Sequence, residues 1–382
     1  MTRVNKKRVV VGMSTCNMAA GSDDVLDFLK EKVAGGLDVE LSITGCTGMC
    51  YSEPQVQVFD EDGTRHLYVG VNANRIAKIV EDHLIAGKPR EKWIVSYDEG
   101  DTKKLMAKQE RIVLANSGVI DPDEIDDYLS ADGYVALRTV LEENDRMQVI
   151  KTVTDSGLRG RGGAGFPTGL KWKFAYGYDN DKKYVVCNAD EGDPGAFMDR
   201  TILESDPHAV LEGMIIGAFA TGADEAYIYC RAEYPLAIKR LNRAIEQATK
   251  KNLLGDNILG KGFNFHVHVK EGAGAFVCGE ETALLSSIEG RRGMPRPRPP
   301  FPAESGLFGK PTTINNVETW ANVPWIIRKG AEAFAAIGTE KSKGSKVFAL
   351  AGKIKRGGLV EVPMGITLDE IIHEIGGGTS LT

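Results

Sequence analysis

The pattern of apolar and polar positions over the first 90 residues predicts a small α/β unit. The apolar run RVVVGM at 8–13 is typical of a buried strand. Residues 22–34 place apolar side chains on one helical face, with Ser22 as the N-cap. The same reasoning predicts four further elements, which are strands at 37–43, 55–59 and 65–69 and a helix at 72–86.

This β-α-β-β-β-α order resembles a thioredoxin-like fold and defines a first module at 1–89. A polar, mostly helical connector is expected at 90–125. From 126 to 333, helices alternate with short apolar strands, which predicts a Rossmann-like α/β domain. Residues 334–382 predict a strand, a glycine turn, a second strand and a helix opened by Thr367, an order that resembles a small ubiquitin-like β-grasp (SLBB-type) domain.

Composition narrows the function classes. The chain has 382 residues, of which 42% are hydrophobic and 26% charged, so it can bury real cores. A formal net charge of −6 argues against a general nucleic-acid binder, and no run is long enough for a membrane span. Six cysteines are too few for a disulfide scaffold. A cytoplasmic protein is therefore expected.

Glycine, at 44 residues, is enriched and clustered. The run SGLRGRGGAGFPTGLKW at 156–172 brings several backbone N–H groups close together without side-chain obstruction, next to Lys171 and ahead of a predicted helix. Such a loop is suited to binding phosphate, whereas the alternative is a glycine-rich surface loop. No clear strand leads into it, so the GxGxxG match within it is a weak indication of a Rossmann fingerprint.

Three further runs carry polar residues in positions that suit a nucleotide. Asn188, Asp190, Glu191 and Asp193 follow a predicted strand, where ligands bind in α/β sheets, although a solvated acidic turn fits too. In the second, Glu280 and Glu281 open a helix and can accept from ribose hydroxyls. The third combines the arginine- and proline-rich segment 290–302 with Asn315 and Asn316, a cationic edge suited to a pyrophosphate.

These four runs, in this order, resemble the FMN- and NADH-binding subunit of respiratory complex I and the flavin subunits of NAD-dependent hydrogenases and formate dehydrogenases. The resemblance covers about 125–375. It implies an FMN site formed by Gly160, Gly162, Gly163, Lys171, Asn188, Asp190, Glu191, Gly279, Glu280, Asn315, Asn316 and Thr319. It implies NADH contacts from Phe166, Phe174, Asp193, Glu281, Arg298 and Phe301.

The resemblance further implies an oxidoreductase in which NADH gives a hydride to FMN, which passes single electrons to iron-sulfur clusters of a larger complex. No protein side chain is required as a catalyst. The implied partners are NADH, a thioredoxin-like iron-sulfur subunit and a hydrogenase-type or ferredoxin-type subunit. Two alternatives stay open, a complex I-type NADH:quinone subunit and a cofactor-free assembly subunit, as do NAD against NADP preference and electron bifurcation.

The first module resembles a thioredoxin-like [2Fe-2S] ferredoxin, but its thiol set is incomplete. Cys16, Cys46 and Cys50 are present, and no cysteine precedes Cys16. Since such a cluster ordinarily takes four ligands, an oxygen of Ser14 or Asn17 would have to complete it, and a docking module without a cluster is the preferred interpretation. Its presence points to the soluble hydrogenase-type branch. The ligands of the family's C-terminal [4Fe-4S] cluster are absent, so a truncated chain is expected.

Overall fold

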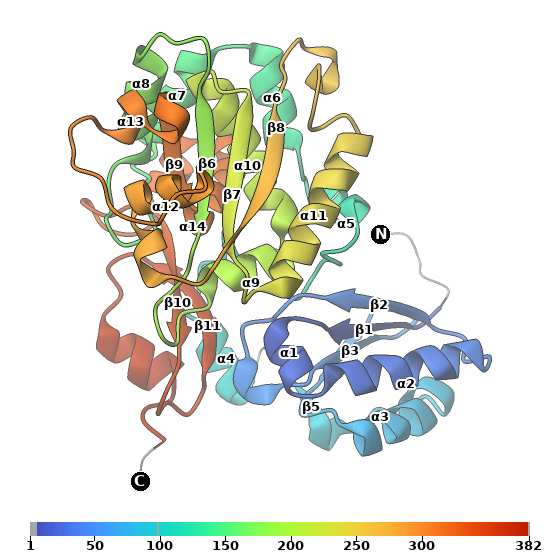
Figure 1. The fold of residues 1–382 in the computed structure, drawn as a ribbon. Coiled ribbons are helices and arrows are strands. Elements are labelled where there is room, and N and C mark those ends of the chain that lie inside the picture. The colour runs from blue at the N-terminus through green and yellow to red at the C-terminus, as the bar shows by residue number, and fades with distance from the viewer. Residues whose placement is uncertain (1–5, 98, 381–382) are drawn as a thin grey trace.

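The computed structural model describes residues 6–97 and 99–380 and shows a mixed α/β protein (Figure 1). Its centre is a parallel sheet in the order β8-β7-β6-β9. The strands are β6 (Tyr184–Ala189), β7 (Glu225–Arg231), β8 (His266–Gly272) and β9 (Thr312–Asn316). All three strand pairs are parallel, so the carboxyl ends of β6 and β9 lie together at one edge, with Asn188 opposite Asn316.

Helices cover this sheet. The most buried is α10 (Pro207–Thr221), every residue of which is buried, as expected of a helix that is apolar on all sides. It packs closely on α14 (Val317–Lys329), and a Cβ at Gly213 would lie 2.1 Å from the carbonyl oxygen of Trp320. The remaining helices of this part are α5 (Ile125–Ser130), α6 (Val135–Glu143), α7 (Arg146–Asp155), α8 (Thr168–Gly177), α9 (Met198–Ser205), α11 (Pro235–Lys250), α12 (Glu281–Ile288), α13 (Pro302–Ser305) and α15 (Ala331–Ala335).

The first module has its own five-stranded sheet in the order β2-β1-β3-β4-β5 and its own apolar core. Its strands are β1 (Arg8–Gly12), β2 (Glu40–Thr44), β3 (Val56–Phe59), β4 (Arg65–Tyr68) and β5 (Ile94–Val95). Its helices are α1 (Thr15–Ala19), α2 (Ser22–Ala34) and α3 (Ala73–Ile79), the last continuing as a π-helix over Val80–Ile85. The helix predicted at 22–34 is confirmed.

Three details of this module differ from the sequence predictions. Strand β2 begins at residue 40 rather than 37, because residues 35–36 still close the helix through hydrogen bonds to its last turn. The short helix α1 was not predicted. Strand β5 pairs with β4 and so extends this sheet beyond the boundary expected at residue 89.

The connector and the C-terminal segment lie against each other. After α4 (Gly100–Met106), the backbone N–H groups of Ile112, Val113 and Leu114 all donate to the buried Glu361 carboxylate, at 2.9 to 3.0 Å. Burial raises the pKa of Glu361 to about 7. The connector is therefore held by one side chain of the C-terminal segment.

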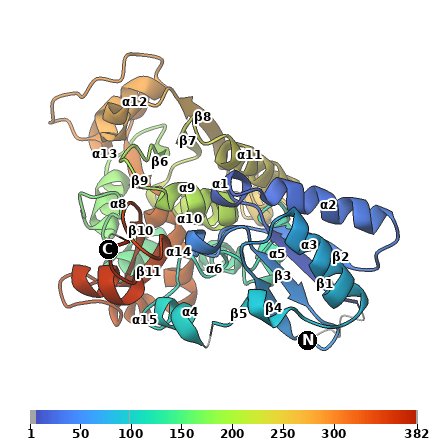
Figure 2. The same ribbon diagram turned by 90° about the horizontal axis from the view of Figure 1, so that it is seen from below.

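The C-terminal segment contains an antiparallel pair, β10 (Ser345–Leu350) and β11 (Gly358–Pro363), followed by a π-helix at Glu370–Ile375. Residues 368–369 form a short α-helical start ahead of this π-helix, and Thr367 caps it as predicted, since the Thr367 Oγ1 accepts from the Glu370 amide at 3.2 Å. Figure 2 shows α4 between this hairpin and the first module. An apolar cluster that includes Met49, Leu105 and Val360 joins the three parts.

Single 3₁₀ turns complete the chain, at Cys50–Ser52, Glu91–Trp93, Ile258–Gly260, Phe276–Gly279 and Leu307–Gly309. No described helix has the length and apolar character that crossing a bilayer requires.

Candidate functional site

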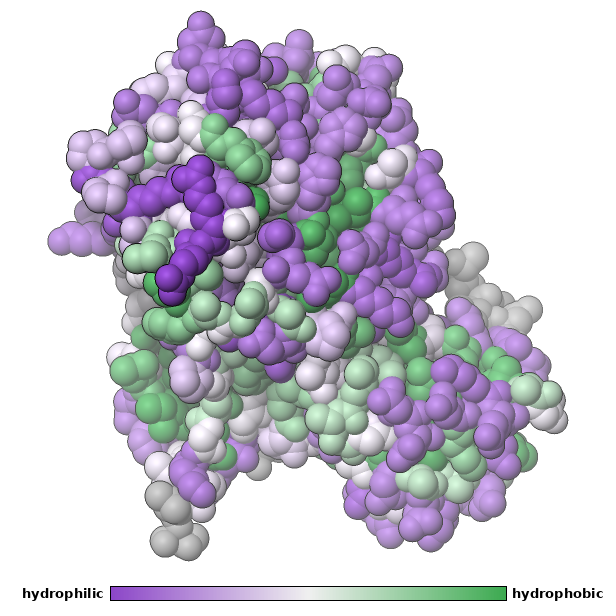
Figure 3. All heavy atoms as spheres, in the orientation of Figure 1, coloured by the Kyte–Doolittle hydropathy of each residue, from purple (hydrophilic) through white to green (hydrophobic). Residues whose placement is uncertain are grey.

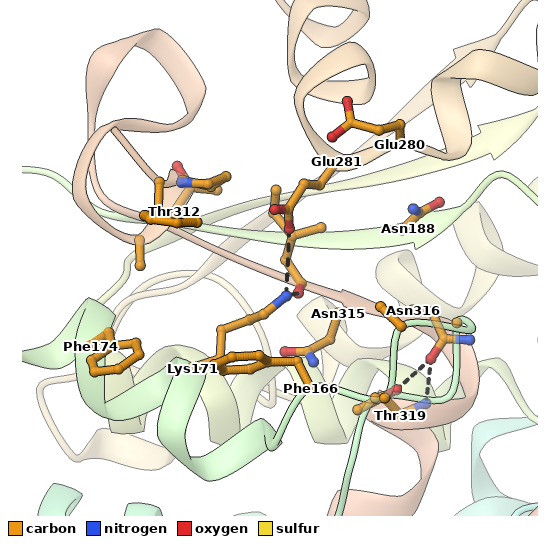
Figure 4. Close-up of a pocket in the computed structure, with 18 of the residues that line it drawn as sticks. Phe166, Lys171, Phe174, Asn188, Glu280, Glu281, Thr312, Asn315, Asn316 and Thr319 are labelled. Atoms are coloured by element: carbon orange, nitrogen blue, oxygen red, sulfur yellow. Dashed lines mark hydrogen bonds and ion pairs between the residues drawn. The ribbon is translucent and has the colours of Figure 1, made fainter. Parts of the chain in front are cut away.

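A cavity of about 690 Å³ opens at the carboxyl ends of β6 and β9. This volume is typical of small-molecule and cofactor sites. Its wall is built by the glycine-rich loop, α8, the start of α12 and the segment before α13 (Figure 4). The lining residues are Gly160, Gly162, Ala164, Gly165, Phe166, Lys171, Phe174, Tyr178, Asn188, Gly279, Glu280, Glu281, Arg298, Phe301, Pro302, Ala303, Thr312, Ile314, Asn315, Asn316 and Thr319.

The glycine-rich loop is folded back on itself and pinned at its base. The Gly160 amide donates to the Phe166 carbonyl at 2.9 Å, and the Arg161 amide donates to Thr319 Oγ1 at 2.9 Å. The Arg161 guanidinium donates to backbone carbonyls of the C-terminal segment, at 2.7 Å to Lys343 and 3.0 Å to Ser345. Gly163 has φ of +105°, a conformation that residues other than glycine rarely adopt, and it lets the loop turn. Gly160, Gly162 and Gly165 line the cavity, so the loop presents bare backbone to it.

Lys171, in the first turn of α8, carries positive charge into the cavity. Its Nζ donates to the Ile314 carbonyl at 3.0 Å and lies 3.6 Å from a carboxylate oxygen of Glu281. Glu281 also pairs with Arg298 at 2.7 Å, and Figure 4 shows its side chain reaching from α12 toward Lys171. Two cations thus share one carboxylate, which leaves capacity for an anionic ligand.

Asn316 ends β9 and caps α14. Its side-chain oxygen accepts from the Thr319 amide at 3.0 Å, and its amide nitrogen donates to Asp199 at 3.3 Å. Burial raises the pKa of Asp199 well above its ordinary value. The neighbouring Asn315 oxygen accepts from the Trp172 indole at 3.1 Å. These bonds fix both asparagines at the cavity, next to a helix N-terminus that favours anions.

The third wall begins α12. One oxygen of Glu280 accepts from the amides of Thr282 and Ala283, both at 2.9 Å, and so caps the helix. Asn188, at the end of β6, donates to the Gly279 carbonyl at 2.9 Å. Figure 3 shows strongly hydrophilic residues gathered over the segment between α12 and α13, where the sequence carries four arginines, Arg291, Arg292, Arg296 and Arg298.

Four predicted site residues, Gly163, Asp190, Glu191 and Asp193, are not on the cavity wall. Asp190 pairs with Arg231 at 3.3 Å, and its second carboxylate oxygen is buried without a hydrogen-bond partner. Glu191 accepts from the amides of Asp199 and Arg200 at 3.1 Å, at the start of α9. Their roles at a nucleotide stay predictions.

Several wall residues were missed by sequence reasoning. They are Ala164, Gly165, Tyr178, Pro302, Ala303, Thr312 and Ile314. The first two lie within the glycine-rich run itself, and Pro302 and Ala303 directly follow Phe301, so proximity to a motif was an available signal. Thr312 and Ile314 carried none, because they are ordinary residues of a buried strand.

The three thiols of the first module come together where it meets α9. The sulfur atoms of Cys46 and Cys50 are 3.9 Å apart, and Arg200 Nη2 donates to Cys16 at 3.4 Å. A hydrogen bond with Cys50 and the charge of Arg200 lower the pKa of Cys16 to about 7. The thiols expected to meet therefore do meet.

The oxygens considered as a fourth ligand have other partners. Ser14 and Asn17 form the capping box of α1, and the Asn17 amide donates to Glu53. Glu53 was not predicted as part of this site. One of its carboxylate oxygens is buried without a hydrogen-bond partner, and burial and the neighbouring thiols raise its pKa to about 10. Three thiols and a buried carboxyl group thus form a partial ligand set.

The cavity fits a flavin phosphate and ribityl chain in the chemistry of its donors. A Cβ at Gly162 would come within 3.1 Å of the Asn316 side chain, so glycine at this position lets the loop lie close against the end of β9. The glycine backbone of the loop, Lys171 and the side-chain amides of three asparagines line the same space. The fold and the cavity together place this chain among α/β proteins whose candidate ligand site lies at the carboxyl edge of a parallel sheet.

Comparison with known proteins shows what the chain is similar to. Residues 153–325 match the family described as the Nuo51 FMN-binding domain. The NADP-reducing hydrogenase subunit HndC of Solidesulfovibrio fructosivorans is 60% identical over 271 residues, 71% of this chain and 55% of that protein. An F-type NADH-quinone oxidoreductase subunit of Rhizobium meliloti is 50% identical over 269 residues, 70% of this chain and 64% of that protein.

A solved structure covers nearly the whole chain. The NAD⁺-reducing [NiFe]-hydrogenase in its H₂-reduced state matches 98% of this chain and 61% of its own, at 30% identity and a TM-score of 0.60. This chain therefore spans between about half and two thirds of the length of these relatives.

Proposed function

We propose that this chain binds FMN and NADH in the cavity and acts as the NADH-oxidising flavoprotein module of a larger oxidoreductase. The observation that carries the proposal is the convergence of the glycine-rich loop, Lys171 and the end of β9 on one cavity, within a segment that matches the Nuo51 FMN-binding domain family. These groups suit a phosphate and its polar chain, and the rest of the wall suits flat rings.

The residues divide by chemistry. Gly160, Gly162 and Lys171 would hold the FMN phosphate and ribityl chain, together with Asn188, Gly279, Glu280, Asn315, Asn316 and Thr319. Phe166, Phe174 and Phe301 are exposed at the wall and offer faces on which nicotinamide and adenine rings can stack. Arg298 and Glu281 lie beside them. When bound, FMN supplies the two-electron acceptor that releases electrons singly.

The assembly we propose is of the soluble hydrogenase type, in the cytoplasm, with iron-sulfur subunits as partners. The first module covers the α9 side of the flavin domain, where the Thr15 amide donates to Glu204 at 2.9 Å and the Cys46 amide donates to Ser205 at 3.2 Å. This attachment supports a docking module of thioredoxin-like type. A division into the first module, which β5 extends to residue 95, a connector up to residue 125, a flavin domain at 126–333 and a β-grasp final part at 334–382 is proposed with it.

The proposal is tested by purifying the chain anaerobically with FMN and recording visible spectra before and after NADH or NADPH. We expect flavin bands near one equivalent that bleach with NADH. Additional absorption at longer wavelength would show that the three thiols hold a cluster. A folded chain that binds no flavin would overturn the proposal, and bleaching by NADPH but not NADH would overturn its choice of substrate.

A further inference from the structure

Three metal-type ligands meet on the first module, outside the cavity and apart from the thiols. Asp60 follows β3, His66 lies in β4 and His83 lies in the π-helical continuation of α3. His66 Nε2 is 2.9 Å from one carboxylate oxygen of Asp60, and His83 Nε2 is 3.1 Å from the other. All three ligand atoms lie within 4.8 Å of one another. Both imidazoles thus aim the same nitrogen at one carboxylate.

The buried histidine is held in place by a second layer of contacts. The Tyr68 hydroxyl lies 2.9 Å from His83 Nδ1 and also accepts from the Arg90 amide at 3.1 Å. With His83 Nδ1–H donating to this oxygen, Nε2 has a free lone pair. Metal-binding histidines commonly have such a partner on the second ring nitrogen, and π-helical turns recur at functional sites. The arrangement orients His83 before any ligand arrives.

We propose that Asp60, His66 and His83 bind a divalent transition-metal ion, with Zn²⁺ as the cation that fits best. Zinc takes imidazole and carboxylate ligands at bond lengths that place tetrahedral neighbours about 3.3 Å apart. One carboxylate oxygen, Asp60 Oδ2, already lies 2.9 Å from His66 Nε2 and 3.3 Å from His83 Nε2, and all three ligand atoms lie within 4.8 Å of one another. Three protein ligands leave a fourth position for water.

The burial of the three side chains indicates how an ion would reach the site and which elements it would join. His83 is 1% exposed, whereas His66 is 15% and Asp60 24% exposed, so an ion can enter from the side of the last two. Bound there, it would link the turn after β3, strand β4 and the end of the α3 helix. Without an ion, a proton on each Nε2 lets both imidazoles donate to the Asp60 carboxylate. Binding of the ion would replace these two hydrogen bonds, with the His83 proton then on Nδ1, where Tyr68 accepts it.

The test measures Co²⁺ and Zn²⁺ binding to the 382-residue chain, comparing wild type with His66→Gln and Asp60→Asn. The matched control is His266→Gln, which removes an exposed histidine that is likewise 3.1 Å from an aspartate, Asp256. We expect one equivalent of Co²⁺ whose spectrum lacks thiolate charge-transfer bands. Its affinity should fall at least tenfold in both test variants and stay unchanged in the control.

Tyr68→Phe tests the partner of His83 Nδ1 rather than a ligand. The variant keeps all three proposed ligands but removes the hydroxyl that orients His83, and we expect it to weaken Co²⁺ binding about 10- to 100-fold. Circular dichroism confirms that each variant is folded. The proposal is overturned if the test variants bind Co²⁺ as wild type does, if His266→Gln loses the same equivalent, or if all bound Co²⁺ shows thiolate bands and so belongs to the cysteines.

Discussion

Thr319→Val tests whether the base of the glycine-rich loop prepares the cavity for FMN. Thr319 is fully buried in the first turn of α14. Its Oγ1 accepts from the Arg161 amide at 2.9 Å and donates to the Asn316 side chain. Valine has nearly the same shape and neither capacity. The variant therefore removes the attachment of the loop backbone to α14 without opening a cavity, while the Arg161 guanidinium keeps its bonds to Lys343 and Ser345.

The magnitude follows from the amide that loses its partner. A buried N–H without a hydrogen bond costs about 1–3 kcal/mol. The adjoining loop residues Gly162 to Ala164 are exposed, so in the variant we expect the loop to move until water satisfies the Arg161 amide. FMN binding must then restore the original position. The expected result is FMN affinity about 5- to 150-fold weaker, with little change in melting temperature.

The assay is quenching of FMN fluorescence on titration with wild type, Thr319→Val and Thr319→Ser. The serine variant keeps the hydroxyl and should bind FMN within a few-fold of wild type. Wild-type affinity in Thr319→Val would refute the reasoning. A large drop in the melting temperature of Thr319→Val with unchanged FMN affinity would refute it as well. The unpaired Arg161 amide would then destabilise the folded protein rather than weaken FMN binding.

Three further predictions concern charge and burial. Lys171→Met should weaken FMN binding at least tenfold, because it removes a positive charge from the cavity. The control Lys183→Met removes donors to the Ala175 and Tyr176 carbonyls at the end of α8 and should leave FMN affinity unchanged. Equal FMN affinities of the two variants would contradict this prediction. Glu361→Gln places a side-chain NH₂ group, which can only donate, next to backbone N–H groups that need an acceptor. It should lower the free energy of unfolding, measured by denaturant melts, by about 2–4 kcal/mol, and a variant as stable as wild type would contradict this prediction. Burial lowers the pKa of His208 from 6.5 to about 4. Between these two pH values the unfolded chain binds a proton that the folded chain does not bind, so the free energy of unfolding of wild type should fall by about 3 kcal/mol as the pH falls from 6.5 to about 4. His208→Gln should lack that slope, and identical pH profiles would contradict the assignment.

Local signals in the sequence were sufficient for much of the fold. The helix at 22–34 has a complete apolar face, and the capping pattern at Thr367 marks the start of the last helix. Helix α1 was missed because five residues are too few to show a period, and its capping box lies inside an otherwise unmarked loop. Strand β5 has two residues and exists only because β4 supplies its partner.

At the site, the sequence alone determined which segments carry nucleotide chemistry, because glycine runs, paired asparagines and helix-opening carboxylates act through local backbone geometry. Only the tertiary structure decided which of their side chains share a space. Asp190 turns to Arg231 and Glu191 to the start of α9, whereas Thr312 and Ile314 reach the wall. Asp60, His66 and His83 meet across two strands and a helix, and no sequence spacing indicates such a meeting. The physical reason is that a side chain's partners depend on strand order and packing, which are set by contacts far apart along the chain.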